Sequence, residues 1–97
     1  MILSNEPGYY REGAWGIRIE NLVAVQAPTV PEGGEVPMHS FETLTWVPID
    51  TRLIDASMLE QPERKWLNRY HQQVYEKVAP LLEADTREWL AEACAEL

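Results

Sequence analysis

The feature that most constrains this chain is a change in the spacing of its apolar residues after Asp55. Before that point, apolar and polar residues alternate along residues 15–25 and 41–47, which is the pattern of half-buried strands. After it, large apolar side chains recur at every fourth position, which predicts a helix. These side chains are Trp66, Tyr70, Val74 and Val78, with Leu67 beside them. Strands followed by helices predict an α+β fold.

Proline and glycine set the limits of the predicted elements. Residues 27–40 contain three prolines and two adjacent glycines, so we expect a surface loop there. Pro62 and Pro80 bracket the first helix. A second helix is expected to begin at Asp85, whose carboxylate would accept from free backbone amides in a capping box with Glu88.

Charge and cysteine content exclude several classes of partner. Sixteen acidic residues against eight basic ones give a formal net charge of −8, which repels nucleic acid and anionic lipid. No segment approaches the roughly 18 apolar residues that cross a bilayer, and the first residues lack a signal-peptide pattern. The single cysteine, Cys94, has no partner for a disulfide, which favours a reducing compartment. We therefore expect a cytoplasmic protein that binds neither nucleic acid nor membrane.

Two glutamates, Glu6 and Glu20, are the candidate metal ligands. If a regular hairpin is centred on Gly13, Glu6 faces Glu20 and their β-carbons lie about 5 Å apart. Opposed carboxylates repel each other unless a cation lies between them, and hard divalent ions suit such oxygen ligands. Pro7 lacks the amide hydrogen that a regular ladder requires, so the register stays open. Spacing alone favours ordinary polar glutamates over a metal site.

Arg18 and Tyr10 belong to the same predicted face as the two glutamates, because alternate residues of a strand share one side. Arg18 is placed to orient a ligating carboxylate, although a surface arginine paired with the nearest acid is the simpler interpretation. Tyr10 is either a hydrogen-bond donor beside the ligands or simple packing near a turn.

These residues stand in two sets of motifs. Residues 4–10 (SNEPGYY) and 16–21 (GIRIEN) resemble the end of the catalytic domain of Xaa-Pro aminopeptidase (aminopeptidase P), a family of the pita-bread metallopeptidases. Further motifs resemble the carboxy-terminal extension of the longer members of that family. These are residues 41–45 (FETLT), 48–50 (PID), 53–54 (LI) and 66–71 (WLNRYH). The resemblance covers nearly the whole chain, in order.

The resemblance implies a fold and a division into domains. Residues 1–40 would be the end of a pita-bread catalytic domain, built of antiparallel strands and ending in the loop rich in proline and glycine. Residues 41–97 would be a carboxy-terminal extension of one strand and two helices. The abrupt start of the chain, almost inside a strand, agrees with a fragment of a longer protein.

The resemblance also implies a hydrolase that removes the amino-terminal residue before proline, with a peptide as substrate and a homodimer as the assembly. Glu6 and Glu20 would be the last two of five protein ligands to two divalent ions, usually manganese. Glu6 would also shuttle protons, while Tyr10 and Arg18 would orient an aspartate ligand.

The resemblance leaves the metal site incomplete in this chain. The other ligands, two aspartates and a histidine, are expected upstream of Met1. His39 and His71 do not replace that histidine, because they lie outside the ligand motif, and we expect both to be structural. The isolated 97-residue chain is therefore expected to bind manganese weakly and to lack peptidase activity.

A second interpretation treats the chain as a non-catalytic module. Its helical stripes would then bury against a partner or a second copy, since large aromatic side chains are common anchors of protein interfaces. In that case Glu6 and Glu20 are ordinary polar residues.

Overall fold

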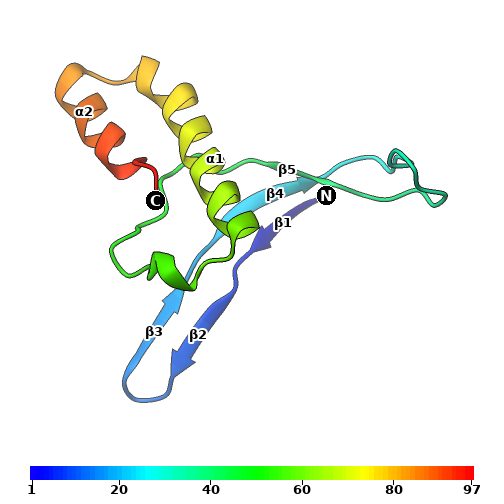
Figure 1. Cartoon of the computed structure of the whole chain (residues 1–97), viewed down its shortest axis with the longest axis horizontal. Coiled ribbons are helices and arrows are strands. Elements are labelled where there is room, and N and C mark those ends of the chain that lie inside the picture. The colour runs from blue at the N-terminus through cyan, green and yellow to red at the C-terminus, as the bar shows by residue number, and fades with distance from the viewer. The chain divides into compact units, whose positions relative to one another are not determined.

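The computed structural model describes residues 1–97, which divide into two compact units, Met1–Thr45 and Trp46–Leu97. The first unit contains β1 (Ile2–Asn5), β2 (Gly8–Arg11), β3 (Trp15–Arg18), β4 (Asn21–Val25) and β5 (Phe41–Thr43). Strands β1, β4 and β5 form a three-stranded antiparallel sheet in the order β1-β4-β5, and β2 pairs with β3 (Figure 1). The predicted α+β class is confirmed.

A tight turn at Gly13 joins β2 to β3. The φ angle of Gly13 is +71°, which lies in the left-handed region that glycine enters without a steric penalty. The amide of Ala14 donates to the carbonyl of Arg11 at 3.0 Å and closes the turn. The predicted turn is therefore confirmed, and it fixes the register of both strands.

The segment rich in proline and glycine, residues 27–40, forms the expected loop between β4 and β5, with one addition. Thr29 and Met38 form an isolated antiparallel bridge, with amide-to-carbonyl distances of 2.9 and 2.7 Å. The strand predicted over residues 41–47 is too long, because β5 ends at Thr43. Close to that end, the amide of Leu22 donates to the Thr45 hydroxyl at 2.8 Å, and a side chain replaces the main-chain ladder.

The second unit is helical. It contains two short 3₁₀ turns, η1 (Ala56–Met58) and η2 (Ala79–Leu81), and two helices, α1 (Gln61–Val78) and α2 (Ala84–Ala93). The helix bracketed by Pro62 and Pro80 is thus confirmed as α1. Its start is secured by Glu63, whose carboxylate accepts from the backbone amide of Glu60 at 2.8 Å and satisfies a donor that the helix leaves free.

The predicted start of the second helix is wrong. Helix α2 is preceded by Glu83 and already contains Asp85 in its first turn, where a carboxylate complements the partial positive charge of the helix end. Arg87 accounts for the earlier start, because its guanidinium donates to the carbonyls of Ala79 at 3.0 Å and Leu82 at 2.9 Å. These bonds tie the first turn of α2 to the connection before it.

The core of the helical unit lies between α1, η2 and α2. Its buried apolar residues are Leu67, Tyr70, Val74, Ala79 and Leu90. Trp66 belongs to the predicted stripe, yet 52% of its surface is exposed, because the buried face of α1 is centred one residue further on.

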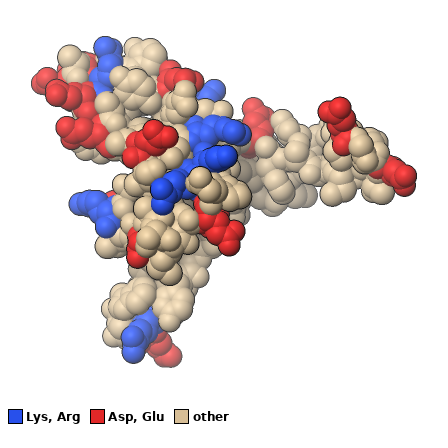
Figure 2. Space-filling view, in the orientation of Figure 1, with Lys and Arg blue, Asp and Glu red and all other residues tan.

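Acidic side chains spread over the region of α2, as Figure 2 shows. No helix of the structure is long and apolar enough to cross a membrane.

His71 is the one fully buried polar side chain of this core. Its Nε2 accepts a hydrogen bond from the amide of Ile49 at 3.0 Å, which requires a neutral ring with the proton on Nδ1. Nδ1 is buried without a hydrogen-bond partner. Burial lowers the pKa of His71, because the charged ring would lose its hydration. His71 is therefore structural, as expected.

The buried His71 predicts a loss of stability in mild acid. Its pKa is lower in the folded chain than its ordinary value of 6.5, so the unfolded chain binds more protons below that pH. The free energy of unfolding should therefore fall as the pH drops from about 7.5 to about 5.5, by at most about 1.4 kcal/mol per pH unit. Urea unfolding followed by tryptophan fluorescence measures this.

Two variants separate His71 from the other groups that titrate in this range. His71→Gln keeps an acceptor for the amide of Ile49 but cannot take up a proton, so its stability should vary less with pH. His39→Gln is the matched control, because it removes the other histidine of the chain, which is exposed. An equal slope in His71→Gln and the unmodified chain contradicts the prediction.

Candidate metal site

One continuous register connects the two halves of the strand ribbon. In β1 and β4 the last opposed pair is Asn5 and Asn21, and in β2 and β3 the first is Gly8 and Arg18. Both pairs are centred on Gly13, so no residue is inserted or lost between them. The hairpin is thus centred on Gly13, which is the condition under which the sequence places Glu6 opposite Glu20.

Glu6 and Glu20 lie at the interruption between the two ladders. Neither belongs to a strand, but the register on both sides assigns them to each other as opposed residues. Pro7 lacks an amide hydrogen and breaks the ladder, while its carbonyl still accepts from the amide of Ile19 at 3.1 Å. The two carboxylates therefore lie at a local opening of an otherwise regular ribbon.

Three polar side chains, Ser4, Arg18 and Tyr10, lie beside the two glutamates on this face of the ribbon. The Ser4 hydroxyl donates to Oε2 of Glu6 at 3.0 Å, and Nε of Arg18 lies 3.3 Å from Oε2 of Glu20. The phenol of Tyr10 is the largest of the influences that raise the pKa of Arg18, followed by the charge of Glu20. The structure thus brings Tyr10 and Arg18 together, as the alternation of the strands predicted.

Ser4 is the contact that the sequence analysis missed. It stands two residues before Glu6 and therefore on the same side of the strand. The same alternation that selected Arg18 and Tyr10 would have selected it. A hydroxyl that donates to one carboxylate oxygen leaves the other oxygen of Glu6 free for a further partner.

The chemistry of this face is that of a partial cation site. Carboxylate oxygens are the ligands that hard divalent cations prefer, and a guanidinium held beside one of them limits its rotation. No group of three or more histidine, cysteine, aspartate or glutamate side chains is placed to hold a metal ion. Any such ion would therefore need ligands beyond those that this chain brings together.

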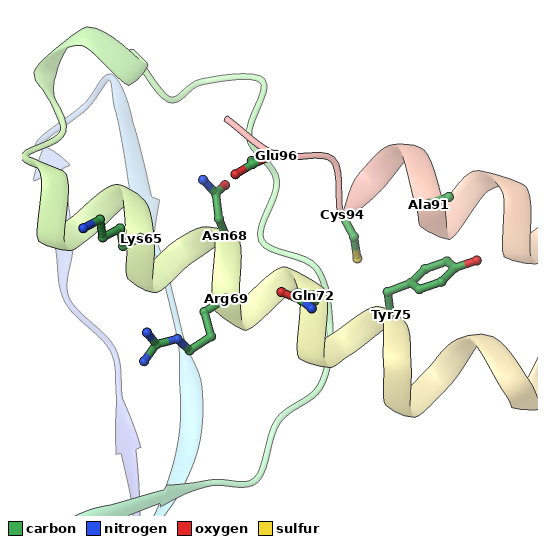
Figure 3. A pocket seen from close by; sticks show the side chains of 8 residues that line it. All are labelled: Lys65, Asn68, Arg69, Gln72, Tyr75, Ala91, Cys94 and Glu96. Carbon is green, nitrogen blue, oxygen red and sulfur yellow. The ribbon is translucent and has the colours of Figure 1, made fainter.

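The helical unit has a pocket of about 560 Å³, which is separate from the face that carries Glu6 and Glu20. Helix α1 and the segment that follows it to the end of the chain line this pocket, and Figure 3 shows Tyr75 and Cys94 directed into the space between the helices. Its lining residues are Lys65, Asn68, Arg69, Gln72, Tyr75, Ala91, Cys94 and Glu96. Burial raises the pKa of the Cys94 thiol, which disfavours the reactive thiolate form.

Comparisons with known proteins agree with the motifs. The model of the family described as the C-terminal region of peptidase M24 matches residues 37–97. A probable Xaa-Pro aminopeptidase P of Coprinopsis cinerea is 54% identical over 93 residues, covering 93% of this chain and 15% of that protein. Aminopeptidase P2 of Arabidopsis thaliana is 52% identical over 92 residues, covering 93% of this chain and 13% of that protein.

A solved structure resembles the fold of the whole chain. It is the X-prolyl aminopeptidase of Caenorhabditis elegans, described as a cytosolic enzyme with a di-nuclear active site. The match has a TM-score of 0.87 and 38% sequence identity, and it covers 99% of this chain and 16% of the solved one.

Fold and motifs together define the class, which is the carboxy-terminal part of a pita-bread peptidase. Within that class, the chain belongs to the family of peptidase M24 carboxy-terminal regions, in the form that Xaa-Pro aminopeptidases carry. It spans 13–16% of the length of the relatives it matches.

Proposed function

We propose that this chain is the part of a metal-dependent aminopeptidase that supplies Glu6 and Glu20 to a site for two divalent ions. The observation that carries the proposal is the register that opposes the two carboxylates, with Arg18 bound to Glu20 on the same face. Relatives named as Xaa-Pro aminopeptidases support the reaction, which is hydrolysis of the amino-terminal bond before proline. The substrate is then a peptide with proline in second place.

The residues present suit such ions, and we propose Mn²⁺ as the metal. When bound, two divalent ions lower the pKa of a shared water and polarise the carbonyl of the scissile bond. Glu20 would contribute a carboxylate held by Arg18, and Glu6 one held by Ser4. Glu6 would also move a proton towards the leaving proline nitrogen, which is the role of a general base that becomes a general acid.

The proposal extends to the surroundings of the enzyme. A cytoplasmic location is supported by the description of the nematode relative as cytosolic. A homodimer is supported by exposed large side chains on the helical unit, which a second copy would cover. These side chains are Leu53, Met58, Trp66, Leu81 and Trp89.

Titration of Mn²⁺ into the isolated chain tests the proposal. We expect weak binding that Glu6→Ala and Glu20→Ala both remove, because each deletes one of the two carboxylates. Glu12→Ala, at the turn, is the matched control and should leave binding as it is. We also expect no hydrolysis of an Xaa-Pro peptide, since the remaining ligands are missing. Binding that survives loss of both Glu6 and Glu20 contradicts the site.

The second candidate is a non-catalytic interaction module, which the same exposed aromatic residues favour. The reading frame upstream of Met1 separates the two candidates. Two aspartates and a histidine in the family's ligand motifs support the enzyme. A frame that encodes no such motifs supports the module.

A further inference from the structure

The ring of Tyr10 lies against two glycines, Gly8 and Gly16. A β-carbon built on Gly16 would lie 2.6 Å from Cδ1 of Tyr10, and one on Gly8 would lie 2.7 Å from its hydroxyl oxygen. Both distances are shorter than any ordinary contact between a β-carbon and another heavy atom. The phenol therefore occupies the space that side chains at positions 8 and 16 would fill.

Backbone conformation does not explain these two glycines. Positive φ angles occur only at Gly13 and Gly33, so Gly8 and Gly16 have conformations open to other residues. Glycine in a strand interior gives up side-chain packing and is expected where another group approaches closely. Here the group that approaches both positions is Tyr10.

The register explains how the phenol reaches its partner. Tyr10 directly opposes Gly16, while Gly8 opposes Arg18. The ring crosses Gly16 and its hydroxyl oxygen comes to the Gly8–Arg18 pair. At that point the phenol lies beside Arg18, whose Nε lies 3.3 Å from Oε2 of Glu20.

We propose that Gly8 and Gly16 are positioning residues, which hold Tyr10 flat on the ribbon so that Arg18 is fixed between the phenol and the Glu20 carboxylate. The guanidinium is a planar group whose donors have fixed directions, so one fixed partner decides where the others point. A side chain at position 16 would turn the phenol away and leave Glu20 as the partner of a mobile arginine. This inference rests on the proposed function only in assigning Glu20 to a metal.

The test uses a complete Xaa-Pro aminopeptidase that carries residues 1–97 as its carboxy-terminal part. Its first measurement is the NMR signal of the Arg18 Nε–H together with those of the Gly16 α-protons, which the Tyr10 ring shields. In Gly16→Ala the Arg18 signal should move to the position it has in Tyr10→Ala. A signal that stays in place in Gly16→Ala overturns the proposal.

The second measurement is Mn²⁺ affinity by calorimetry. Gly16→Ala should weaken binding about tenfold, the usual effect of losing a group that orients a metal ligand. In the Tyr10→Ala background the same substitution should cause no further loss, because the ring that the added methyl group would meet first is then absent. Equal losses in both backgrounds would show a purely structural role for Gly16 and would overturn the proposal.

Tyr10→Phe keeps the test decisive if Gly16→Ala fails to fold. This variant leaves the ring on the glycines but removes the oxygen that lies beside Arg18, so it should keep the shielding of Gly16 and shift the Arg18 signal. An unshifted Arg18 signal overturns the proposal. Unchanged Mn²⁺ affinity in Glu20→Ala would refute the proposed function instead, and the NMR signals would still decide the role of the glycines.

Discussion

In a complete Xaa-Pro aminopeptidase that carries this chain, Glu6→Gln lowers kcat/KM by about 10²–10⁴-fold, the range attributed to a lost general acid or base. The amide has nearly the shape of the carboxylate, and it can still accept the hydrogen bond from Ser4. It carries no charge to bind a cation and no proton to pass to a leaving nitrogen. Steady-state hydrolysis of an Xaa-Pro peptide at saturating Mn²⁺ measures the loss.

Two further variants test whether the loss of activity is specific to the proposed metal ligands. Glu20→Gln should also lower activity, and it removes the ion pair with Arg18 as well. Glu12→Gln is the matched control, since Glu12 is an exposed glutamate of the Gly13 turn, outside the Glu6–Glu20 opening. Activity that is unchanged in Glu6→Gln, or equally reduced in Glu12→Gln, would contradict a catalytic role for Glu6.

The sequence contains a local signal for the register of the ribbon, and Pro7 is the reason that the sequence alone left the register open. Gly13 marks the one position where the turn needs a positive φ, and counting outward from it pairs Glu6 with Glu20. Period-two alternation then assigns Tyr10 and Arg18 to the same face. These inferences need only the geometry of an antiparallel hairpin.

Other features depend on contacts that sequence periodicity does not contain. The early end of β5 follows from the hydroxyl of Thr45, and the early start of α2 follows from Arg87 bonding two carbonyls before it. The exposure of Trp66 follows from which side of α1 meets the rest of its unit. The division of the whole protein into domains after Ser40, and the roles of Glu6, Glu20, Tyr10 and Arg18 in a metal site, stay predictions.

The glycines of the ribbon also depend on contacts that sequence periodicity does not contain. Gly8, Gly13 and Gly16 are identical in the sequence, yet only Gly13 is explained by its own backbone angle. The other two are explained by a side chain that comes from another position, Tyr10. A sequence pattern can identify a turn glycine such as Gly13. It cannot distinguish Gly8 and Gly16 from glycines that merely weaken a strand.

The largest effect on stability is expected for Tyr70→Ala in the helical unit. Tyr70 is only 4% exposed, and its ring stacks between Trp66, at a centroid distance of 5.3 Å, and Trp46, at 5.9 Å. Its hydroxyl donates to the carbonyl of Val47 at 2.9 Å. One side chain thus packs the core and fastens the segment that precedes α1.

Removing that ring should lower the free energy of unfolding by about 3–5 kcal/mol, as for other large aromatic side chains cut back to alanine. A small domain has only about 5–15 kcal/mol in total, so Tyr70→Ala should remove a large share of the stability of the helical unit. Urea denaturation followed by circular dichroism measures the change, because both helices lie in this unit.

Two controls divide the effect of Tyr70 into its parts. Tyr70→Phe keeps the stacked ring and removes the hydroxyl, which donates to the carbonyl of Val47 and accepts from its amide at 3.4 Å. It should cost about 0.5–1.5 kcal/mol for each hydrogen bond lost, less than the loss of the whole ring. Leu81→Ala, at a side chain that is 82% exposed, should change stability by less than about 0.5 kcal/mol. If Tyr70→Ala costs no more than Tyr70→Phe, the ring is not the anchor of this core, and the segment that begins at Trp46 must be held to α1 by other contacts, first among them the bond from Ile49 to His71.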